Sequence, residues 1–255
     1  VDGTKMMEDF KAQAERFDTD TRWGMVTKID LSARPFKVEI DEKTNVIADT
    51  VIIATGASAK WLGIEDEKRL NGYGVSACAT CDGFFYKGMD VVVVGAGDTA
   101  AEEATYLAKL CNKVTILVRK SKMRASKAMQ KRVFNTSNLE VMFNHETKSI
   151  NGEPGEIGVE GVTAVNNLTG EETIIPAKGF FVAIGHTPNT SLFKGQLDMD
   201  DNGYLIIEAG TSKTKIDGVF AAGDVADHVY RQAVTSAGTG CMAALDAERF
   251  LASQE

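Results

Sequence analysis

Residues 89–118 read MDVVVVGAGDTAAEEATYLAKLCNKVTILV, and this stretch decides the fold. Met89–Val94 is predominantly apolar, as expected of a parallel strand that is buried on both faces. Asp98–Cys111 has apolar residues at helical spacing, and Val114–Val118 is the next apolar run. Strand, helix and strand in this order form a βαβ unit of the usual length, so we predict an α/β fold.

A glycine turn joins the first strand to the helix, and its sequence, Gly95-Ala96-Gly97-Asp98-Thr99-Ala100, fits the pattern G-x-G-x-x-A. One glycine allows the tight turn, and the second lets a pyrophosphate approach the backbone at the helix N-terminus. Because the turn lies between a buried strand and a helix, we predict a dinucleotide site. Its residues are Gly95, Gly97, Asp98, Thr99 and Ala100. The alternative is a glycine turn that binds nothing.

The end of the second strand indicates which dinucleotide binds. An acidic residue there would bond the ribose 2′-hydroxyl of NAD. This strand ends instead in Val118-Arg119-Lys120, with Arg124 soon after. Cations at this position suit a 2′-phosphate, so we predict NADPH. The alternative is that basic residues, Lys122 and Lys127 among them, simply decorate an exposed loop.

A C-x-x-C pair, Cys78-Ala79-Thr80-Cys81, precedes this unit. At this spacing the start of a helix brings two sulfurs within bonding reach, and a helix N-terminus favours the reactive thiolate. The alternatives are an inert pair or a zinc site, which needs four ligands that the scattered remaining cysteines and histidines do not obviously supply. Asp82 is a candidate proton donor to a departing thiolate or flavin, and it also suits the start of a helix; the two roles are compatible.

The redox pair and the nucleotide site together predict a third component. A disulfide takes two electrons, and nicotinamide gives them as hydride. Direct hydride transfer to a disulfide is not the usual route, because a flavin normally mediates. We therefore predict a flavin site in the same protein.

Composition excludes several classes of protein. The chain has 255 residues, and its 28 basic and 36 acidic side chains give a net charge of −8. That charge disfavours a nucleic-acid-binding or anionic-membrane surface. No stretch approaches about 20 apolar residues, so we expect no membrane span. Four cysteines in a chain of this size do not form a secreted disulfide framework, so we expect a cytoplasmic protein.

The remaining periodicity predicts further elements. Helices are expected at Thr4–Phe17, with an apolar side that includes Met6, Met7, Phe10, Ala14 and Phe17, at Ser126–Thr136 and at Ala233–Leu251. Small residues early in the last helix suggest that its first turns lie close to a backbone or a ligand. Strands are expected at Thr21–Ile29, Phe36–Ile40, Val46–Ala54, Leu139–Phe143, Gly158–Asn166, Glu172–Pro176, Gly179–Ile184 and Val219–Ala222.

Longer motifs resemble a known family, the bacterial-type (low-molecular-weight) NADPH-dependent thioredoxin reductases. The matching segments are Ser76–Phe85, Val94–Ala104, Arg119–Ser126, Phe181–Asn189 and Gly218–Phe250. The resemblance implies that NADPH reduces FAD, that FAD reduces the Cys78–Cys81 disulfide, and that the dithiol reduces thioredoxin. Cys81 would face the flavin, Cys78 would attack thioredoxin, and Asp82 would be the family's acid.

The resemblance also assigns the cofactor-binding residues. Arg119, Lys120 and Arg124 match the family's 2′-phosphate cluster, although Val118 and Lys120 depart from its usual His-Arg-Arg…Arg. A lysine keeps the charge but loses the planar fork, which predicts weaker phosphate binding. The flavin would contact residues from two distant stretches: Thr55, Gly56, Gly223, Asp224, Val225, Arg231, Gln232 and Ala233.

The family has two Rossmann-like dinucleotide-binding domains. By this resemblance, residues 1–58 and 187–255 are a discontinuous FAD domain, and residues 59–186 are the inserted NADPH domain with the C-x-x-C. No G-x-G-x-x-G stands before Val46, so we expect the FAD domain to be N-terminally incomplete and residue 1 to lie inside a longer parent. A homodimer is implied by the family.

Two other functions stay open at this point. One is a non-enzymatic NADP-binding fragment that cannot hold FAD. The other is a peroxide-defence flavoprotein reductase, which shares the C-x-x-C module but usually has an acidic residue where this chain has Arg119 and Lys120.

Overall fold

The computed structural model describes residues 2–255, which divide into two compact units. Ser58–Thr187 form one, called here the inserted unit. Val1–Ala57 and Pro188–Glu255 form the other, the flanking unit. The chain passes between them through two short paired strands, β5 (Ala57–Ala59) and β14 (His186–Pro188).

A five-stranded parallel sheet is the centre of the inserted unit. Its order is β6 (Val75–Ser76), β13 (Gly179–Val182), β7 (Asp90–Val94), β8 (Lys113–Val118) and β9 (Leu139–Phe143). Side chains alternate between two cores, so that Val91 and Val93 lie in one and Val92 and Val94 in the other. The apolar run is thus buried on both faces, as the sequence predicted.

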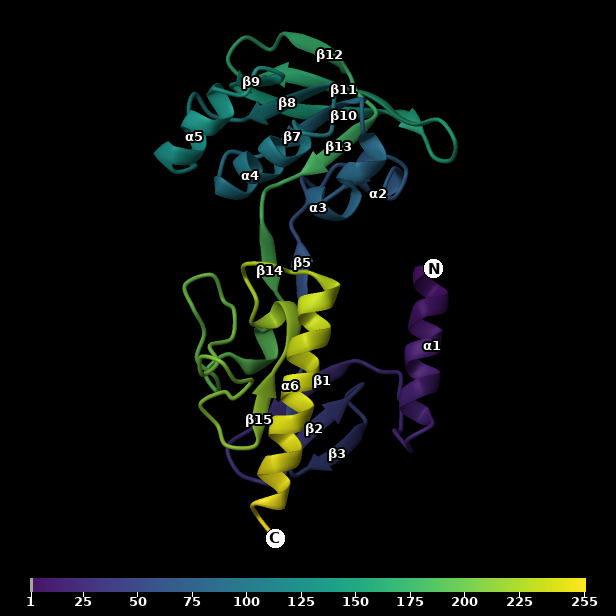
Figure 1. The fold of residues 1–255 in the computed structure, drawn as a ribbon, viewed down its shortest axis with the longest axis vertical. Helices are drawn as coiled ribbons and strands as arrows, with labels where there is room; N and C mark the ends of the chain where they lie inside the picture. Colours follow the sequence, from purple (N-terminus) through teal and green to yellow (C-terminus); the bar gives the residue numbers. More distant parts are fainter. Residues whose placement is uncertain (1) are drawn as a thin grey trace. The chain divides into compact units, whose positions relative to one another are not determined.

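Helices cover one face of this sheet and a second sheet covers the other (Figure 1). The helices are α4 (Asp98–Leu107) and α5 (Lys127–Phe134). The second sheet is antiparallel, with β10 (His145–Glu153), β11 (Gly158–Asn166) and β12 (Glu172–Pro176). Two shorter helices, α2 (Glu65–Arg69) and α3 (Ala79–Asp82), complete the unit.

Helix α4 stops short of its predicted end at Cys111. The Lys109 and Leu110 N–H groups bond carbonyls three residues back, which ends the helix in a tight turn. Cys111 is nevertheless buried in the helix-side core. Burial, and after it the charge of Asp90, raises the pKa of its thiol to about 11.

The flanking unit has two small sheets and a long helix. The strands β1 (Val26–Asp30), β2 (Phe36–Ile40) and β3 (Thr44–Ala48) form an antiparallel sheet. A parallel pair joins β4 (Val51–Ile53) to β15 (Val219–Ala221). Helix α6 (Ala233–Ala252) runs beside this pair and packs Ala243 and Ala247 against Phe220 (Figure 1).

One strand predicted for the flanking unit is wrong in part, whereas the predicted N-terminal helix is confirmed. The strand predicted at Val46–Ala54 is two strands, because a bend separates β3 from β4 and each joins a different sheet. Helix α1 (Gly3–Glu15) forms, but it buries no residue: Met7 and Phe10 are 61% and 56% exposed. Its apolar side therefore does not contribute to the core of this structure.

The other predicted elements form, most with ends that move by a few residues, but the strand predicted at Thr21–Ile29 begins only at Val26. Four of the predicted strands have the predicted bounds: Phe36–Ile40, Leu139–Phe143, Gly158–Asn166 and Glu172–Pro176. Strand β10 was missed because its sequence, HETKSINGE, lacks apolar alternation. Its pairing with β11 holds it in place. No helix within residues 2–255 is long and apolar enough to cross a membrane.

Candidate active site

The two glycines of the fingerprint have different surroundings. A Cβ on Gly95 would stand 2.4 Å from the Ala183 carbonyl oxygen and 2.7 Å from the Ala100 Cβ, and the Gly95 φ is +151°. A Cβ on Gly97, the N-cap of α4, would meet nothing within 4 Å. Gly95 therefore permits close packing of strand and helix, whereas Gly97 keeps the space before the helix N-terminus open. This is the space that a pyrophosphate needs.

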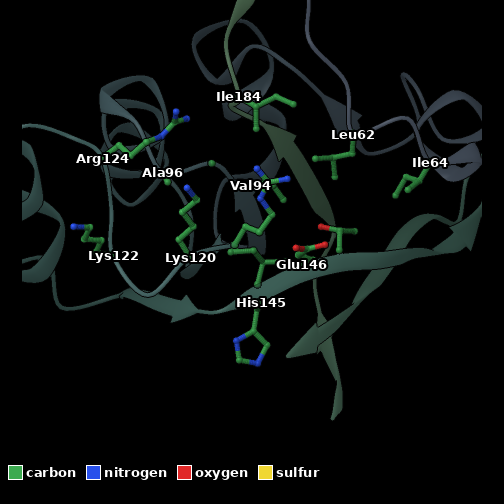
Figure 2. Close-up of a pocket in the computed structure, with 14 residues that line it drawn as sticks. Leu62, Ile64, Val94, Ala96, Lys120, Lys122, Arg124, His145, Glu146 and Ile184 are labelled. Carbon is green, nitrogen blue, oxygen red and sulfur yellow. The ribbon is translucent and has the colours of Figure 1, made fainter. Parts of the chain in front are cut away.

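A pocket of about 440 Å³ opens beside this turn (Figure 2). Four cations line it, and Leu62, Ile64 and Ile184 supply apolar wall. The cations are Arg119, Lys120, Lys122 and Arg124. None of them forms an ion pair with any residue from 2 to 255. The pocket thus combines free positive charge with an apolar wall, which suits a phosphorylated dinucleotide.

The structure separates the predicted nucleotide residues into two groups. Gly95, Arg119, Lys120 and Arg124 line the pocket. Gly97, Asp98, Thr99 and Ala100 form the adjoining helix start without lining it. Asp98 Oδ1 accepts the Ser126 N–H at 2.9 Å, so this carboxylate ties the helix start to the basic loop.

Backbone hydrogen bonds hold the basic loop in place. The Arg124 and Ala125 N–H groups both donate to the Ala96 carbonyl, at 2.7 and 2.9 Å. The Lys120 carbonyl accepts from Asn144, and the Arg119 carbonyl accepts from the Asn167 side chain. The backbone of the cationic residues is therefore fixed before any ligand arrives, although their side chains are exposed.

Sequence reasoning missed several residues that line the pocket: Leu62, Ile64, His145, Glu146, Thr147 and Ile184. Three of these belong to β10, the strand with no apolar alternation. Leu62 and Ile64 are held by Glu67, whose buried carboxylate accepts the N–H groups of residues 62, 63 and 64 at 2.9, 2.8 and 3.3 Å. No local motif signals this arrangement.

Cys78 and Cys81 form a disulfide directly after β6. Cys78 is the N-cap of α3, as the spacing predicted, and its Sγ lies 3.2 Å from the Cys81 N and 3.4 Å from the Thr80 Oγ1. These donors would stabilise a thiolate on Cys78. Cys81 is exposed and Cys78 is half-buried.

The disulfide and the nucleotide turn lie at the same edge of one sheet. Strands β6 and β7 both flank β13 and run parallel to it, so their carboxyl ends meet at one edge. Two strand spacings separate them, roughly 10 Å in a standard sheet. Ligands of open α/β sheets bind at this edge.

Asp82 and Ser76 share a short hydrogen bond beside the cysteines. The Ser76 hydroxyl donates to Asp82 Oδ2 at 2.6 Å and accepts the Cys78 N–H at 3.0 Å. Ser76 is buried at 5% exposure, and sequence reasoning assigned it no role. Burial raises the pKa of the nearby Tyr86 phenol, and the charge of Asp82 raises it further.

Two aromatic side chains follow the redox helix and face solvent. Phe84 is 67% exposed and Phe85 is 73% exposed. Both lie in the short helical turn Gly83–Tyr86, directly after α3. Large apolar groups in this position suit contact with another protein surface.

The predicted flavin residues come together at one edge of the flanking unit. Strands β4 and β15 are parallel neighbours, and the Ala222 N–H bonds the Ile53 carbonyl at 2.9 Å. The turns that follow them, at Gly56 and at Gly223, therefore lie at the same edge. A Cβ on Gly56 would meet nothing within 4 Å, which leaves open space beside this turn.

Helix α6 approaches the Gly223 turn closely. The Gly223 N–H bonds the Thr239 hydroxyl at 2.9 Å, and the Ser236 hydroxyl bonds Asp224 Oδ1 at 3.1 Å. A Cβ on Gly223 would stand 3.2 Å from the Ser236 Oγ. The first turns of this helix thus approach a backbone at Ser236, as predicted, whereas a Cβ on Gly238 or Gly240 would meet nothing within 4 Å.

Asp227 holds the loop that leads into α6. Its carboxylate accepts the N–H groups of Val229, Tyr230 and Arg231 at 2.9, 2.8 and 3.1 Å. Burial alone would raise the pKa of Asp227, but these donors lower it below its ordinary value. Arg231 has a φ of +49°, Gln232 caps the helix, and Ala233 is its first residue.

Comparison with known proteins places these features in a family. A family model described as pyridine nucleotide-disulphide oxidoreductase matches residues 5–240. The thioredoxin reductase of Rickettsia conorii is 51% identical over 251 residues, which cover 98% of this chain and 81% of that protein. The thioredoxin reductase of Streptomyces clavuligerus is 49% identical over 251 residues, 98% of this chain and 77% of that protein. Among solved structures, thioredoxin reductase from Giardia duodenalis matches with a TM-score of 0.93 and 44% identity, covering 99% of this chain and 82% of that chain.

Proposed function

The chain belongs to the pyridine nucleotide-disulphide oxidoreductases, and among them to the thioredoxin reductases, and on this premise we propose how its residues divide the reaction. The inserted unit binds NADPH and carries the redox disulfide, and the flanking unit holds FAD. One observation carries the proposal: the Cys78–Cys81 disulfide and the cationic nucleotide pocket occur at the same edge of one parallel sheet.

The nucleotide is NADPH because the pocket offers four cations without ion-pair partners among residues 2–255. Arg119, Lys120 and Arg124 bind the 2′-phosphate. Gly97 leaves room for the pyrophosphate at the start of α4, where backbone N–H groups are free to bond it. The apolar wall of Leu62, Ile64 and Ile184 excludes water from the rest of the nucleotide.

A bound flavin supplies the two-electron relay between a nicotinamide and a disulfide. Its site is the edge formed by the turns after β4 and β15. The residues that hold it are Thr55, Gly56, Gly223, Asp224, Val225, Arg231, Gln232 and Ala233. The open space beside Gly56 and the loop fixed by Asp227 fit a ligand at this edge.

The reduced cysteine pair then reduces thioredoxin in two exchange steps. The Cys78 thiolate attacks one sulfur of the thioredoxin disulfide, and the other sulfur leaves as a thiol after taking a proton. Cys81 attacks the mixed disulfide at the Cys78 sulfur, which restores the Cys78–Cys81 disulfide and releases reduced thioredoxin. Asp82 exchanges protons with the cysteine pair, and the exposed Phe84 and Phe85 receive the partner's surface.

We place this activity in the cytoplasm, as the cysteine content indicates, and in a homodimer, as the family resemblance implies. Size-exclusion chromatography with light scattering tests the dimer. A mass near twice 27.5 kDa supports it, and a mass near 27.5 kDa at micromolar concentration contradicts it.

An absorbance spectrum tests the proposed reaction directly. The purified chain is mixed with FAD, freed of unbound flavin, and titrated with NADPH without oxygen. We expect a protein-bound flavin band that bleaches with NADPH and recovers when oxidised thioredoxin is added. In Cys78→Ser, bleaching persists but thioredoxin no longer restores the band. A chain that binds NADPH but never retains flavin contradicts the enzyme and supports a nucleotide-binding fragment.

A further inference from the structure

We infer that the buried hydroxyl of Ser76 holds the Asp82 carboxyl group in both of its protonation states and so positions it for proton exchange with the cysteine pair. The inference rests on the proposed role of Asp82. Ser76 is a positioning residue here, because it acts through Asp82.

The hydroxyl of Ser76 has three polar neighbours. It donates to Asp82 Oδ2 at 2.6 Å, and it accepts the Cys78 N–H at 3.0 Å. The Cys78 carbonyl oxygen lies 3.4 Å away as a second possible acceptor for the same hydrogen. A hydroxyl group has one donor hydrogen and two acceptor lone pairs, so it can serve all three neighbours in turn.

Two arrangements of hydrogen atoms follow. With Asp82 ionised, the Ser76 hydrogen points at the carboxylate across the 2.6 Å between the two oxygens. With Asp82 protonated, the Asp82 O–H donates to Ser76 Oγ, and the Ser76 hydrogen turns to the Cys78 carbonyl. The Cys78 N–H remains bonded in both. The Ser76 hydroxyl, the Cys78 N–H and Asp82 Oδ2 therefore each keep a hydrogen-bond partner before and after proton transfer.

The fold fixes the Ser76 side of this pair. Ser76 lies on β6, where it is in register with Phe181 of the central sheet, and it is 5% exposed. The carboxylate lies at the end of α3, whose Asp82 N–H bonds the Cys78 carbonyl at 3.1 Å. Two kinds of titratable group belong to the same segment as the carboxylate: Cys81 directly precedes Asp82, and the charge of Asp82 raises the pKa of the Tyr86 phenol. Of these groups, only the cysteines change their bonding in the reaction.

The proton balance can be written for oxidation of the dithiol by glutathione disulfide. One cysteine thiol gives its proton to Asp82 as its sulfur attacks, and glutathione leaves as a thiolate. The second cysteine then attacks the mixed disulfide, which closes the Cys78–Cys81 bond and expels the second glutathione as a thiolate, and the proton of this cysteine passes to one of the two glutathione thiolates. Asp82 returns its proton to the other glutathione thiolate, so the two cysteine thiols and glutathione disulfide become the Cys78–Cys81 disulfide and two glutathione thiols.

A double-mutant cycle tests the inference without flavin or nucleotide. The reduced chain is mixed with glutathione disulfide, quenched with acid at intervals, and the disulfide is quantified by mass spectrometry after alkylation. We expect Ser76→Ala to slow disulfide formation roughly tenfold, the effect of losing one hydrogen bond to a charged group. Asp82→Asn slows it at least as much. The double variant is no slower than Asp82→Asn alone.

A matched control is available in the flanking unit. The Ser212 hydroxyl, also buried, donates to Asp246 Oδ2 at 2.7 Å, far along the sequence from the cysteines. Ser212→Ala removes a similar bond and should leave the rate unchanged. Ser76→Thr keeps a hydroxyl and should recover most of the rate if it folds, as judged by its thermal unfolding.

The possible outcomes distinguish the positioning role of Ser76 from the proton-exchange role of Asp82. Equal slowing by Ser76→Ala with and without Asp82 would show that Ser76 acts only on the fold or on Cys78, and would overturn the inference. An unchanged rate in Asp82→Asn would overturn the role of Asp82 itself. Thioredoxin reduction by the Asp82→Asn holoenzyme would then show whether the proposed function survives.

Discussion

The two glycine turns at which ligands are proposed to bind are built in opposite ways. The turn at Gly95 is made from one continuous stretch, because its strand, glycines and helix follow one another in residues 90–107. The turn at Gly223 is assembled from two stretches more than a hundred residues apart, since β15 pairs with β4. The first is held by close packing around Gly95. The second is held by side-chain hydrogen bonds from α6.

This difference predicts which kind of substitution each turn tolerates least. At Gly95 any side chain collides with backbone, which cannot move away. At Gly223 the neighbour is a serine side chain, which can shift. The nucleotide turn should therefore be intolerant of added volume, and the flavin turn should be sensitive to lost hydrogen bonds.

Gly95→Ala should have the largest effect. Its Cβ would stand 2.4 Å from the Ala183 carbonyl oxygen, so strand and helix must separate. We expect a loss of about 3 kcal/mol in the free energy of unfolding of the inserted unit. Chemical denaturation measures this loss. Gly97→Ala is the control, because it should fold within about 0.5 kcal/mol of the parent yet bind NADPH roughly tenfold more weakly. Normal stability of Gly95→Ala would contradict the packing account.

Arg124→Gln should have the second-largest effect, and it should change the affinity for NADPH without changing the stability of the fold. Losing one charge-assisted hydrogen bond to the 2′-phosphate costs about 2 kcal/mol, or roughly thirtyfold in the Kd for NADPH. Binding of NADH, which lacks that phosphate, should not change. Isothermal titration calorimetry with each nucleotide measures the ratio of the Kd for NADPH to the Kd for NADH. Lys120→Arg should tighten NADPH binding, because a guanidinium bonds phosphate through two N–H groups. If binding of NADPH and of NADH weakened equally, Arg124 would not contact the 2′-phosphate.

Gly223→Ala should have a smaller effect on stability, confined to the flanking unit. An alanine at φ +73° costs about 1–2 kcal/mol, and the 3.2 Å contact with Ser236 adds to it. Gly210→Ala is the matched control, since its φ is +79° and no atom lies within 4 Å. The difference between the two variants isolates the contact. Hydrogen exchange should quicken near Ser236 in Gly223→Ala but not in Gly210→Ala. If both variants lost the same stability and showed the same exchange near Ser236, the contact between residue 223 and Ser236 would have no effect.

Asp227 should give the smallest effect, and one that depends on pH. The pKa of Asp227 is lowered in the folded chain, so its ionised form stabilises the loop. That stability is complete above the ordinary carboxyl pKa of about 3.9 and is lost as the pH falls through the lower, folded value. Asp227→Asn should cost about 1 kcal/mol at neutral pH and lose this acid dependence. Hydrogen exchange of residues 228–231 against pH measures it. If the stability of this loop still fell at acid pH in Asp227→Asn, another titratable group would be responsible for the pH dependence.

Contiguous motifs made much of the fold predictable. The apolar strands β7 and β8, the helix between them and the C-x-x-C at a helix start were all predicted, because each depends on neighbours within a few residues. The four strands with matching bounds have clear apolar or β-branched runs. Strand β10 escaped prediction because it is polar, and the bend between β3 and β4 escaped because both flanks are apolar.

The candidate site was predictable in its motifs but not in its supporting contacts. Cys78, Asp82 and Arg124 stand in recognisable patterns. Ser76, Glu67 and Asp227 do not, since a single serine or acidic residue has no distinctive spacing. Their importance follows from which backbone groups they bond in the folded chain.

The sequence by itself determined the α/β unit, its phosphate-sized turn, the cations beside it and the redox pair, because periodicity and spacing act over short distances along the chain. Only the tertiary structure decided that β15 joins β4, that polar β10 walls the nucleotide pocket, and that Ser76 meets Asp82. Such pairings are not decided by any one segment. They follow from burying both faces of a sheet at once while satisfying every buried polar group.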